Sequence, residues 1–561
     1  MKFPELEYKR PDIELVKKEY SNLTASFRSA ESFEQQSEIL YKINELRNDF
    51  RTHESIASVR HSINTEDEQY EKEQNYFDEI MPHYEDLENN FYRAINASPH
   101  KARLIDKFGD QLFTIAELMV KTFEPEIIDD LTKENRLSTE YTNLIASAKI
   151  EFNGEVYNLS GIEPFTQSTD REVRRKASEA KFKFLADNKE KLDELFDKLV
   201  KTRHRIAQKL GYNNFVELGY KRMLRSDYNM EMVAKFRENI QKHIVPICVK
   251  LREAQEKRLG LDKLMYYDLP LAFKNGNPKP KGEPDWIIEN GMKMYSELSE
   301  ETREFFSFMR EHEMMDLVNK KGKAAGGYCT FINNYKSPFI FSNFNGTSHD
   351  IDVLTHEAGH AFQVYSSRNL EVQEYHWPTY EACEIHSMSM EFFTWPWMHL
   401  FFKEETDKYK FDHLAGSLLF LPYGATVDEF QHEVYLNPDM TPDERNAKWR
   451  ELEKKYTPSK NYEGNEYLEN GGYWQRQLHI YSTPFYYIDY TLAQICAFQF
   501  WLKMKDDYKT AWQDYLTLCE AGGSRSFLEL VKLAKLESPF KEGIVERLAN
   551  EIRNELNQIK V

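Results

Sequence analysis

The chain has 561 residues, of which 41% are hydrophobic and 30% are charged, a composition typical of a folded globular protein. Its formal net charge of −19 disfavours nucleic acid and anionic membranes as partners, because an acidic surface repels both. Five scattered cysteines form no CxxC pair and the N-terminus carries no apolar signal-peptide stretch, which together favour a reducing, cytoplasmic location. No apolar window is long enough to predict a membrane-spanning helix.

The first part of the chain reads as a series of long helices. Over residues 12–52, 65–96 and 102–123, apolar residues recur at three- and four-residue steps among many charges, which is the pattern of amphipathic helices. We find no sustained heptad register, so a coiled coil is not predicted. Residues 149–159 alternate apolar and polar around Asn-Gly, which predicts a β-hairpin, and a helical pattern resumes over 168–211.

The residue composition changes after residue 320, where a glycine-rich stretch precedes two short strand patterns. Tyr328–Phe331 and Pro338–Ser342 are predicted as strands. Ser348 is expected to cap a helix that follows them. Asp350 and Asp352 would stand in the first turn of this helix, which is the end that favours negative charge.

The predicted helix carries the sequence His-Glu-Ala-Gly-His at positions 356–360. Because residues four apart share one face of a helix, His356 and His360 can bind one metal ion, and Glu357 can reach a water on that ion. This is the H-E-x-x-H pattern of zinc hydrolases. The three-histidine extension of the pattern is excluded, since Gln363 and Ser366 stand where it requires Gly and His.

A zinc hydrolase of this kind needs a third protein ligand. Five downstream carboxylates are candidates: Glu371, Glu374, Glu381, Glu384 and Glu391. The first two fall in a connecting segment and are less well placed. The last three share one face of a second helix among apolar residues, where a cation would offset the cost of burying their charges. Spacing alone does not separate Glu381 from Glu384.

A stretch rich in tyrosine, residues 472–490, is the candidate for the groups that stabilise a tetrahedral intermediate. Tyr486 and Tyr490 are four apart, so their hydroxyls can converge on one side of a helix. His479 lies seven before Tyr486 and would share that side in a continuous helix, although Pro484 interrupts it.

Three of these stretches together resemble a known family. Residues 341–350, 356–361 and 384–391 are similar to the thimet oligopeptidase and oligoendopeptidase F family of zinc peptidases, and most similar to its oligoendopeptidase F and Pz-peptidase branch. The specific features are the Gly in H-E-x-G-H and the segment E-x-x-S-x-x-x-E. The clear match runs from about residue 320 to about residue 500.

The resemblance implies a site with one zinc ion bound by His356, His360 and Glu384. A ligand set of two His and one Glu favours zinc over cobalt or manganese. The resemblance also implies that Glu391 and Asp352 orient the histidines from outside the ligand set. These residues would form the metal side of the active site.

The resemblance places a His and tyrosines over the metal, where they bind the substrate carbonyl and steady the intermediate. The matching residues here are His479 and Tyr490, with Tyr486 as a further candidate. The chain departs from the thimet branch at Thr483-Pro484, which leaves open whether Tyr486 or Tyr490 contributes more.

The implied fold is mainly α: a helical, zincin-type peptidase with a small β-sheet beside the metal helix and a deep substrate channel between two mostly helical halves. Residues 1–200 are expected to wall the channel, and residues 201–561 to form the catalytic part. Gly326, Gly327 and Tyr328 of the strand pair are expected to contact bound peptide, because an edge strand can pair with an extended chain.

The predicted function is a zinc-dependent oligoendopeptidase that hydrolyses internal bonds of short unstructured peptides, with Glu357 activating a zinc-bound water. One alternative is a zinc carboxypeptidase with the same active-site design, in which Arg476 would grip the terminal carboxylate. The other is an inactive helical scaffold. A scaffold would be expected to have lost a ligand or the base, and all of these residues are present.

Overall fold

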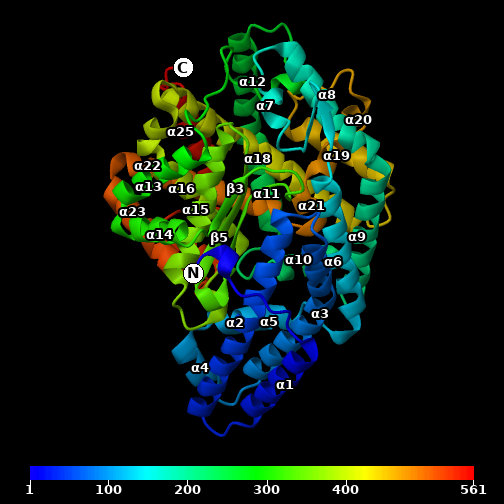
Figure 1. The fold of residues 1–561 in the computed structure, drawn as a ribbon, viewed down its shortest axis with the longest axis vertical. Helices are drawn as coiled ribbons and strands as arrows, with labels where there is room; N and C mark the ends of the chain where they lie inside the picture. The colour runs from blue at the N-terminus through cyan, green and yellow to red at the C-terminus, as the bar shows by residue number, and fades with distance from the viewer.

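The computed structural model describes residues 1–561. The chain begins with five helices that form the lower end of the molecule in Figure 1. They are α1 (Ile13–Ser29), α2 (Phe33–Ile63), α3 (Glu68–Asn96), α4 (Lys101–Phe108) and α5 (Gln111–Val120). The helices predicted from the apolar period are therefore present. Asp12, Ser32 and Asp67 each accept a backbone N–H at a helix start, which satisfies donors that the helix leaves free.

These N-terminal helices have a hydrophobic core of their own. It contains 21 buried residues, among them aromatic side chains from α1, α2 and α3. The rings of Phe50 and Tyr84 stack with their centroids 3.9 Å apart, and Tyr20 meets Tyr84 edge-on at 6.1 Å. The high aromatic content of the sequence is thus used for packing between long helices.

The predicted hairpin at residues 149–159 is present as strands β1 (Ile150–Phe152) and β2 (Glu155–Tyr157), which pair antiparallel. Asn153 and Gly154 form the turn with φ of +52° and +85°. Two central residues with positive φ are what a tight hairpin turn of this hand requires, and Asn-Gly adopts them at the least cost.

The remaining helices surround a second, larger core of 109 buried residues. Those before the central sheet are α6 (Ile128–Ala146), α7 (Glu163–Thr166), α8 (Arg171–Asp187), α9 (Lys189–Lys209), α10 (Phe215–Arg222), α11 (Met230–Asn239), α12 (Val245–Leu259), α13 (Pro284–Leu298) and α14 (Glu300–Glu311). Those after it are α15 (His349–Ser367), α16 (Tyr380–Phe393), α17 (His399–Phe402), α18 (Thr406–Leu436), α19 (Pro442–Tyr456), α20 (Glu466–Glu469), α21 (Leu478–Ser482), α22 (Tyr487–Asp506), α23 (Tyr508–Ala521), α24 (Phe527–Leu533) and α25 (Ile544–Leu556). No helix is long and apolar enough to cross a membrane.

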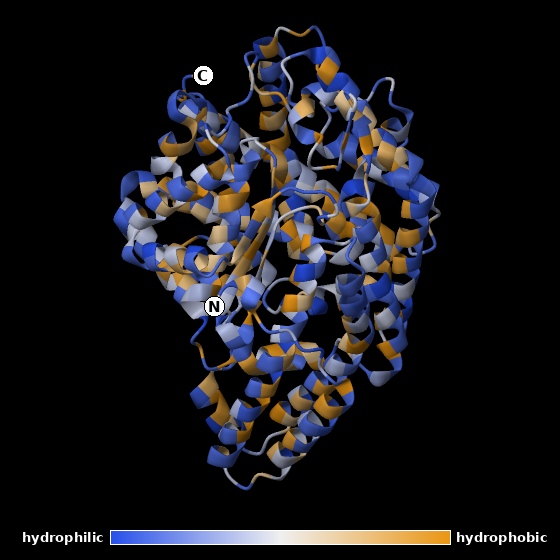
Figure 2. Cartoon of the chain, viewed as in Figure 1, coloured by the Kyte–Doolittle hydropathy of each residue, from blue (hydrophilic) through white to orange (hydrophobic).

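A three-stranded sheet lies in the middle of the molecule, between the helices on its two sides (Figure 1). Its strands are β3 (Met315–Val318), β4 (Tyr328–Ile332) and β5 (Ser337–Phe344), in the order β3-β5-β4. Strand β5 is central and almost wholly buried, and its most hydrophobic part is the run Phe339–Phe341 (Figure 2). Strand β4 pairs antiparallel with β5 and leaves its other edge free of strand partners.

Helix α15 follows β5 directly, but its start differs from the prediction. Ser348 makes no side-chain capping hydrogen bond, because its backbone is already helical and a capping residue must be extended. Asp350 instead holds the turn that precedes the helix: its carboxylate accepts the backbone N–H groups of Asn345 and Gly346 at 2.9 and 2.8 Å. The turn that precedes α15 is therefore held by a side chain of the helix itself.

Candidate metal centre

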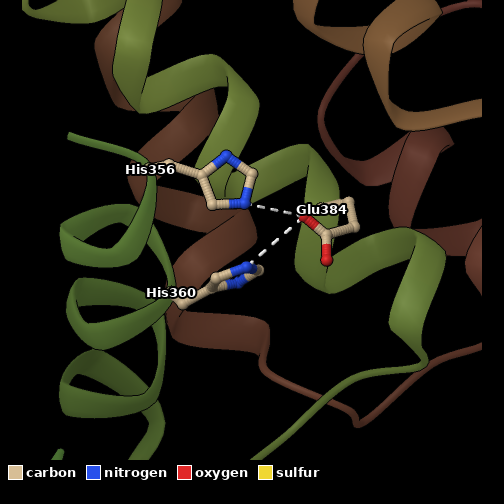
Figure 3. A group of neighbouring side chains, drawn as sticks. All are labelled: His356, His360 and Glu384. Atoms are coloured by element: carbon tan, nitrogen blue, oxygen red, sulfur yellow. Dashed lines mark ion pairs between the residues drawn. The ribbon is translucent and has the colours of Figure 1, made fainter. Parts of the chain in front are cut away.

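Helices α15 and α16 bring two histidines and one glutamate together. Nε2 of His356 lies 3.2 Å from Oε2 of Glu384, and Nε2 of His360 lies 3.4 Å from the same oxygen. The three side chains point toward one another in Figure 3. One ligand atom from each lies within 4.8 Å of the others, a spacing that suits a single metal ion.

The close approach of the two helices depends on Gly359. A Cβ atom at this position would lie 2.6 Å from Cα of Ser387 and 2.7 Å from the carbonyl oxygen of His386, both backbone atoms of α16. Any larger residue would push the helices apart. The glycine in His-Glu-Ala-Gly-His therefore sets the distance at which Glu384 meets the histidines.

The structure brings Glu384, and not Glu381, to the histidines. Both carboxylate oxygens of Glu381 are buried without a hydrogen-bond partner, and burial and the nearby Asp489 raise its pKa to about 8. Glu384 is held on two sides: Ser387 Oγ donates to its Oε2 at 2.8 Å, and the Tyr486 hydroxyl donates to its Oε1. Its carboxylate is thus oriented toward the centre before any metal is considered.

Glu391 connects the centre to a third helix. Its Oε1 lies 2.7 Å from Nδ1 of His356, and its Oε2 lies 2.7 Å from Nε2 of His413 on α18. A carboxylate on the far nitrogen of a metal-binding histidine fixes the ring and its tautomer, leaving Nε2 for the metal. Asp352 is placed differently, because it accepts its hydrogen bond from Tyr409 at 2.7 Å and from no histidine of the centre.

The electrostatics of the centre favour a cation. Burial alone would raise the pKa of Glu384, but His360 and His356 hold it well below its usual range. Burial likewise opposes ionisation of Glu391, yet His356 and His413 lower its pKa to about 2. In turn the two carboxylates raise the pKa of His356 well above its usual value, against the effect of burial. The same anionic field would stabilise a bound divalent ion.

Glu357 has the environment of a general base. It is buried beside the two histidines, and its Oε2 has no hydrogen-bond partner. An orphaned carboxylate oxygen inside a cavity is costly unless a ligand or water meets it. Burial raises the pKa of Glu357, which moves it toward the range where a carboxylate can accept and return a proton near neutral pH. These residues therefore fit the metal that the donor set implies.

The tyrosine-rich stretch does not form one helix. Helix α21 ends at Ser482 and α22 begins at Tyr487, and Phe485 between them has a φ of +69°. Its left-handed backbone is held by hydrogen bonds: its N–H donates to Gln431 at 3.1 Å, and its carbonyl accepts from Arg225 at 2.6 Å. Its ring packs against Gly219, where a Cβ would lie 2.5 Å from it.

This break folds His479 and the two tyrosines onto one side of the cavity. Nε2 of His479 lies 3.0 Å from the Tyr490 hydroxyl, and the His479 ring centroid lies 5.4 Å from that of Tyr486. Burial lowers the pKa of His479 to about 4, so its imidazole is neutral at pH 7. Burial keeps the Tyr490 hydroxyl protonated by raising its pKa. Tyr486 is the exception, since its hydroxyl points to Glu384.

A cavity of about 1360 Å³ lies over these residues. This exceeds the usual ~300–1,000 Å³ of small-molecule sites. It is lined by Glu357 of α15 and Tyr490 of α22, and by Arg47 and Tyr92 of the N-terminal helices. Arg476 also lines it, stacked on Tyr473 at 4.5 Å and without an ion-pair partner.

The edge strand borders the same cavity. Gly326, Gly327 and Tyr328 all line it, and Gly326 has a φ of +92°. A Cβ on Gly327 would lie 3.2 Å from Oε1 of Glu357, so the backbone passes directly beside this carboxylate. The Tyr328 ring stacks on Phe341 of β5 at 4.8 Å.

Comparison with known sequences gives the family. The sequence profile described as Peptidase family M3 matches residues 165–550, and that of the Peptidase M3 N-terminal domain matches residues 3–123. The chain belongs to peptidase family M3. The predicted resemblance and the mainly α fold are both confirmed, and this M3 chain is a metallopeptidase.

Several relatives are similar to the M3 chain over most of its length. A solved structure of Pz peptidase A with an inhibitor is 60% identical, covers 100% of both chains and superposes with a TM-score of 0.99. An oligoendopeptidase F homologue of Borreliella burgdorferi is 24% identical over 76% of this chain and 72% of its own. A further homologue, of Mycoplasma genitalium, is 23% identical over 74% of this chain and 72% of its own.

Two contacts of this M3 peptidase escaped sequence reasoning. His413 meets Glu391 from another helix, and Gln477 places its amide nitrogen 2.8 Å from Nδ1 of His479. No local signal marks His413, because its partner lies on a different element. Gln477 lies two residues before His479, and residues two apart do not face each other on a helix. The spacing therefore does not predict their contact.

Proposed function

We propose that this M3 peptidase is a zinc-dependent oligoendopeptidase that hydrolyses internal bonds of short unstructured peptides. The observation that carries the proposal is the meeting of His356, His360 and Glu384 beside the partnerless carboxylate oxygen of Glu357, at the wall of a large cavity. The family supports peptide hydrolysis, and the donor set supports zinc.

The three residues would hold one zinc ion, with Glu391 fixing the ring of His356. When bound, zinc polarises the scissile carbonyl and makes a water more acidic. Asp352 contributes at a distance, through its negative charge near His413. Its direct hydrogen bond is with Tyr409 and not with His356 or His360.

Glu357 accepts the proton of the attacking water and passes it to the leaving amine. Its raised pKa suits both halves of this transfer, because the carboxylate must hold a proton briefly and release it. The buried position keeps bulk water from competing for the proton. Such proton transfer contributes about 10²- to 10⁴-fold to rate.

His479 and Tyr490 donate hydrogen bonds to the oxyanion of the tetrahedral intermediate. Both line the cavity, and each carries a proton at neutral pH that it can donate. Tyr486 holds Glu384 through its hydroxyl, so we assign it a supporting part and Tyr490 the larger one.

Peptide would lie along the free edge of β4, where Gly326, Gly327 and Tyr328 offer backbone groups beside Glu357. We propose that residues 1–200 wall the channel and that residues 201–561 carry the chemistry. Arg47 and Tyr92 among the lining residues support this division. A walled cavity admits short, unstructured peptides more readily than folded proteins. The scattered cysteines support a cytoplasmic location.

The carboxypeptidase alternative is supported by Arg476, which lies in the cavity without a carboxylate partner. A peptide blocked at both ends separates the two activities. An endopeptidase cleaves it, whereas a carboxypeptidase needs the free terminal carboxylate and leaves it intact.

The decisive variant is Glu357→Gln, which keeps the shape of the side chain and removes its basicity. We expect zinc content to stay at one ion per chain and kcat to fall about 10²- to 10⁴-fold. Metal analysis and cleavage of a blocked peptide measure both. Full activity in a zinc-loaded variant would refute the assigned mechanism.

A further inference from the structure

Gln477 joins three side chains into a hydrogen-bonded chain that leads to Tyr490. The Tyr423 hydroxyl donates to Oε1 of Gln477 at 2.8 Å. Nε2 of Gln477 lies 2.8 Å from Nδ1 of His479, and Nε2 of His479 lies 3.0 Å from the Tyr490 hydroxyl. All four residues line the cavity or pack directly behind its wall.

The direction of this chain is set at its far end. Arg476, which can only donate, lies 5.9 Å from the centre of the Tyr423 ring. The Tyr423 hydroxyl proton points to Oε1 of Gln477, a direction that agrees with a cation near the ring. With Oε1 accepting that proton, the amide presents its NH₂ group to His479, so Nδ1 of His479 is an acceptor.

A neutral imidazole carries its proton on one nitrogen only. With Nδ1 accepting from Gln477, the proton of His479 must be on Nε2, the nitrogen that faces Tyr490. An Nε2 that carries a proton cannot accept the Tyr490 proton, so the protons of both residues stay available to the oxyanion. The opposite tautomer would accept the Tyr490 proton and present the oxyanion with no donor from either residue.

The amide of Gln477 is not engaged in local structure. Gln477 is the residue that precedes α21, yet its side chain does not cap that helix. Its two polar atoms go instead to Tyr423 and His479. The contacts therefore serve the cavity wall rather than the helix start.

We propose that Gln477 is a positioning residue that keeps the proton of His479 on Nε2, so that His479 and Tyr490 both stand as donors toward the oxyanion. This inference rests on the proposed function, in which those two residues stabilise the intermediate. It adds the residue that determines their protonation pattern.

The first test compares Gln477→Met with the parent enzyme on a blocked peptide. We expect kcat to fall roughly 10- to 100-fold, less than the ~10²- to 10³-fold cost of deleting an oxyanion donor itself. KM, zinc content and the midpoint of thermal unfolding should change little. Gln513→Met, an exposed position on α23, is the matched control and should match the parent.

The second test is a double-mutant cycle with His479→Ala. Because Gln477 acts through His479, Gln477→Met should cost less than about twofold in kcat once His479 is gone. A role in folding alone would cost the same in both backgrounds. Full additivity, or a kcat of Gln477→Met within twofold of the parent, would overturn the proposal. The Glu357→Gln experiment is independent of this outcome, so failure of one is distinguishable from failure of the other.

Gln477→Glu keeps the shape and serves if Gln477→Met does not fold. A carboxylate accepts from Nδ1 and draws the proton away from Nε2, so kcat should fall. It also raises the pKa of His479, whose other neighbours are Tyr486, Tyr487, Tyr490 and Glu384. At lower pH the imidazolium carries both protons and donation returns. The ratio of variant to parent kcat should therefore rise as pH falls, and a ratio that is flat with pH would contradict the proposal.

Discussion

Two buried charge networks line one cavity, and they differ in how completely their polar atoms are paired. On the N-terminal side, Arg47 pairs with Glu88 at 3.1 Å and with Glu374 at 2.8 Å, and Arg51 pairs with Glu88 at 2.8 Å. Tyr92 completes this network by donating to Glu374 at 2.7 Å. Every charge there has a partner of opposite sign.

At the candidate metal centre the buried polar atoms are paired less completely. One buried oxygen of Glu357 has no hydrogen-bond partner, and a single oxygen of Glu384 lies close to both His356 and His360. Buried charges that are fully paired stabilise the folded arrangement in which the pairs form. Unpaired buried charges lower the stability of the fold and are retained where chemistry needs them. The contrast agrees with our proposal that the first network belongs to the wall and the second to the chemistry.

The largest expected effect on this contrast comes from Glu384→Gln. Losing the anionic ligand should abolish zinc binding and lower kcat/KM by about 10³-fold or more, since bound metal supplies several kcal/mol of transition-state stabilisation. Glu381→Gln is the matched control on the same helix, and it should keep its zinc. Metal analysis of the two purified variants is the measurement. Loss of zinc from Glu381→Gln with retention in Glu384→Gln would reverse the ligand assignment.

A smaller effect is expected from Glu391→Gln, which leaves the ligands in place and removes the charge behind His356. Zinc affinity should weaken about 10- to 100-fold, the usual cost of an outer partner. Competition with a chelator of known affinity measures it. Asp352→Asn provides the comparison, because Asp352 contacts Tyr409 and not a histidine. An equal loss in both variants would mean that charge alone, and not contact with the ring, sets the affinity.

The smallest effect on activity is expected on the wall, from Glu88→Gln. Burial opposes ionisation of Glu88, but Arg51 and Arg47 lower its pKa below the unfolded value. A lowered folded pKa contributes stability that is present above the unfolded pKa of about 4.3 and is lost as pH falls through the folded pKa.

The unfolding free energy of the parent should therefore fall more steeply below about pH 4.3 than that of Glu88→Gln. Denaturant titrations at pH 6 and in the acid range measure this difference. At neutral pH the variant should be less stable, because the buried Arg47 and the half-buried Arg51 lose the negative charge of Glu88. Its kcat should stay close to that of the parent, and a large loss of kcat in a stable variant would place Glu88 with the chemistry.

Sequence reasoning succeeded where the chemistry is local. The spacing of His356 and His360 on one helix follows from the helical repeat, and the hairpin at residues 149–159 follows from its Asn-Gly turn. It could not choose between Glu381 and Glu384, because both lie on one face of α16. That choice depends on how α16 crosses α15, which the packing at Gly359 determines.

The sequence alone does not predict contacts between elements that lie far apart along the chain. Glu374 was weighed as a metal ligand but pairs with Arg47 and Tyr92, which come from helices near the N-terminus. The hydroxyl of Tyr486 was expected over the metal but meets Glu384, because the chain turns sharply at Phe485. Neither outcome has a signature in residue order, since each depends on the tertiary path of the chain.

The turn at Phe485 has a consequence for how this enzyme can evolve. Its left-handed backbone costs about 1–3 kcal/mol, which surrounding contacts must offset. The Phe485 ring fills the space that a side chain at Gly219 would need. A Cβ atom at Gly219 would lie 2.5 Å from the nearest ring carbon. A side chain at position 219 is therefore tolerated only if a smaller residue replaces Phe485. Gly219 on α10, which does not line the cavity, is thus tied by epistasis to the segment that delivers Tyr486 and Tyr490.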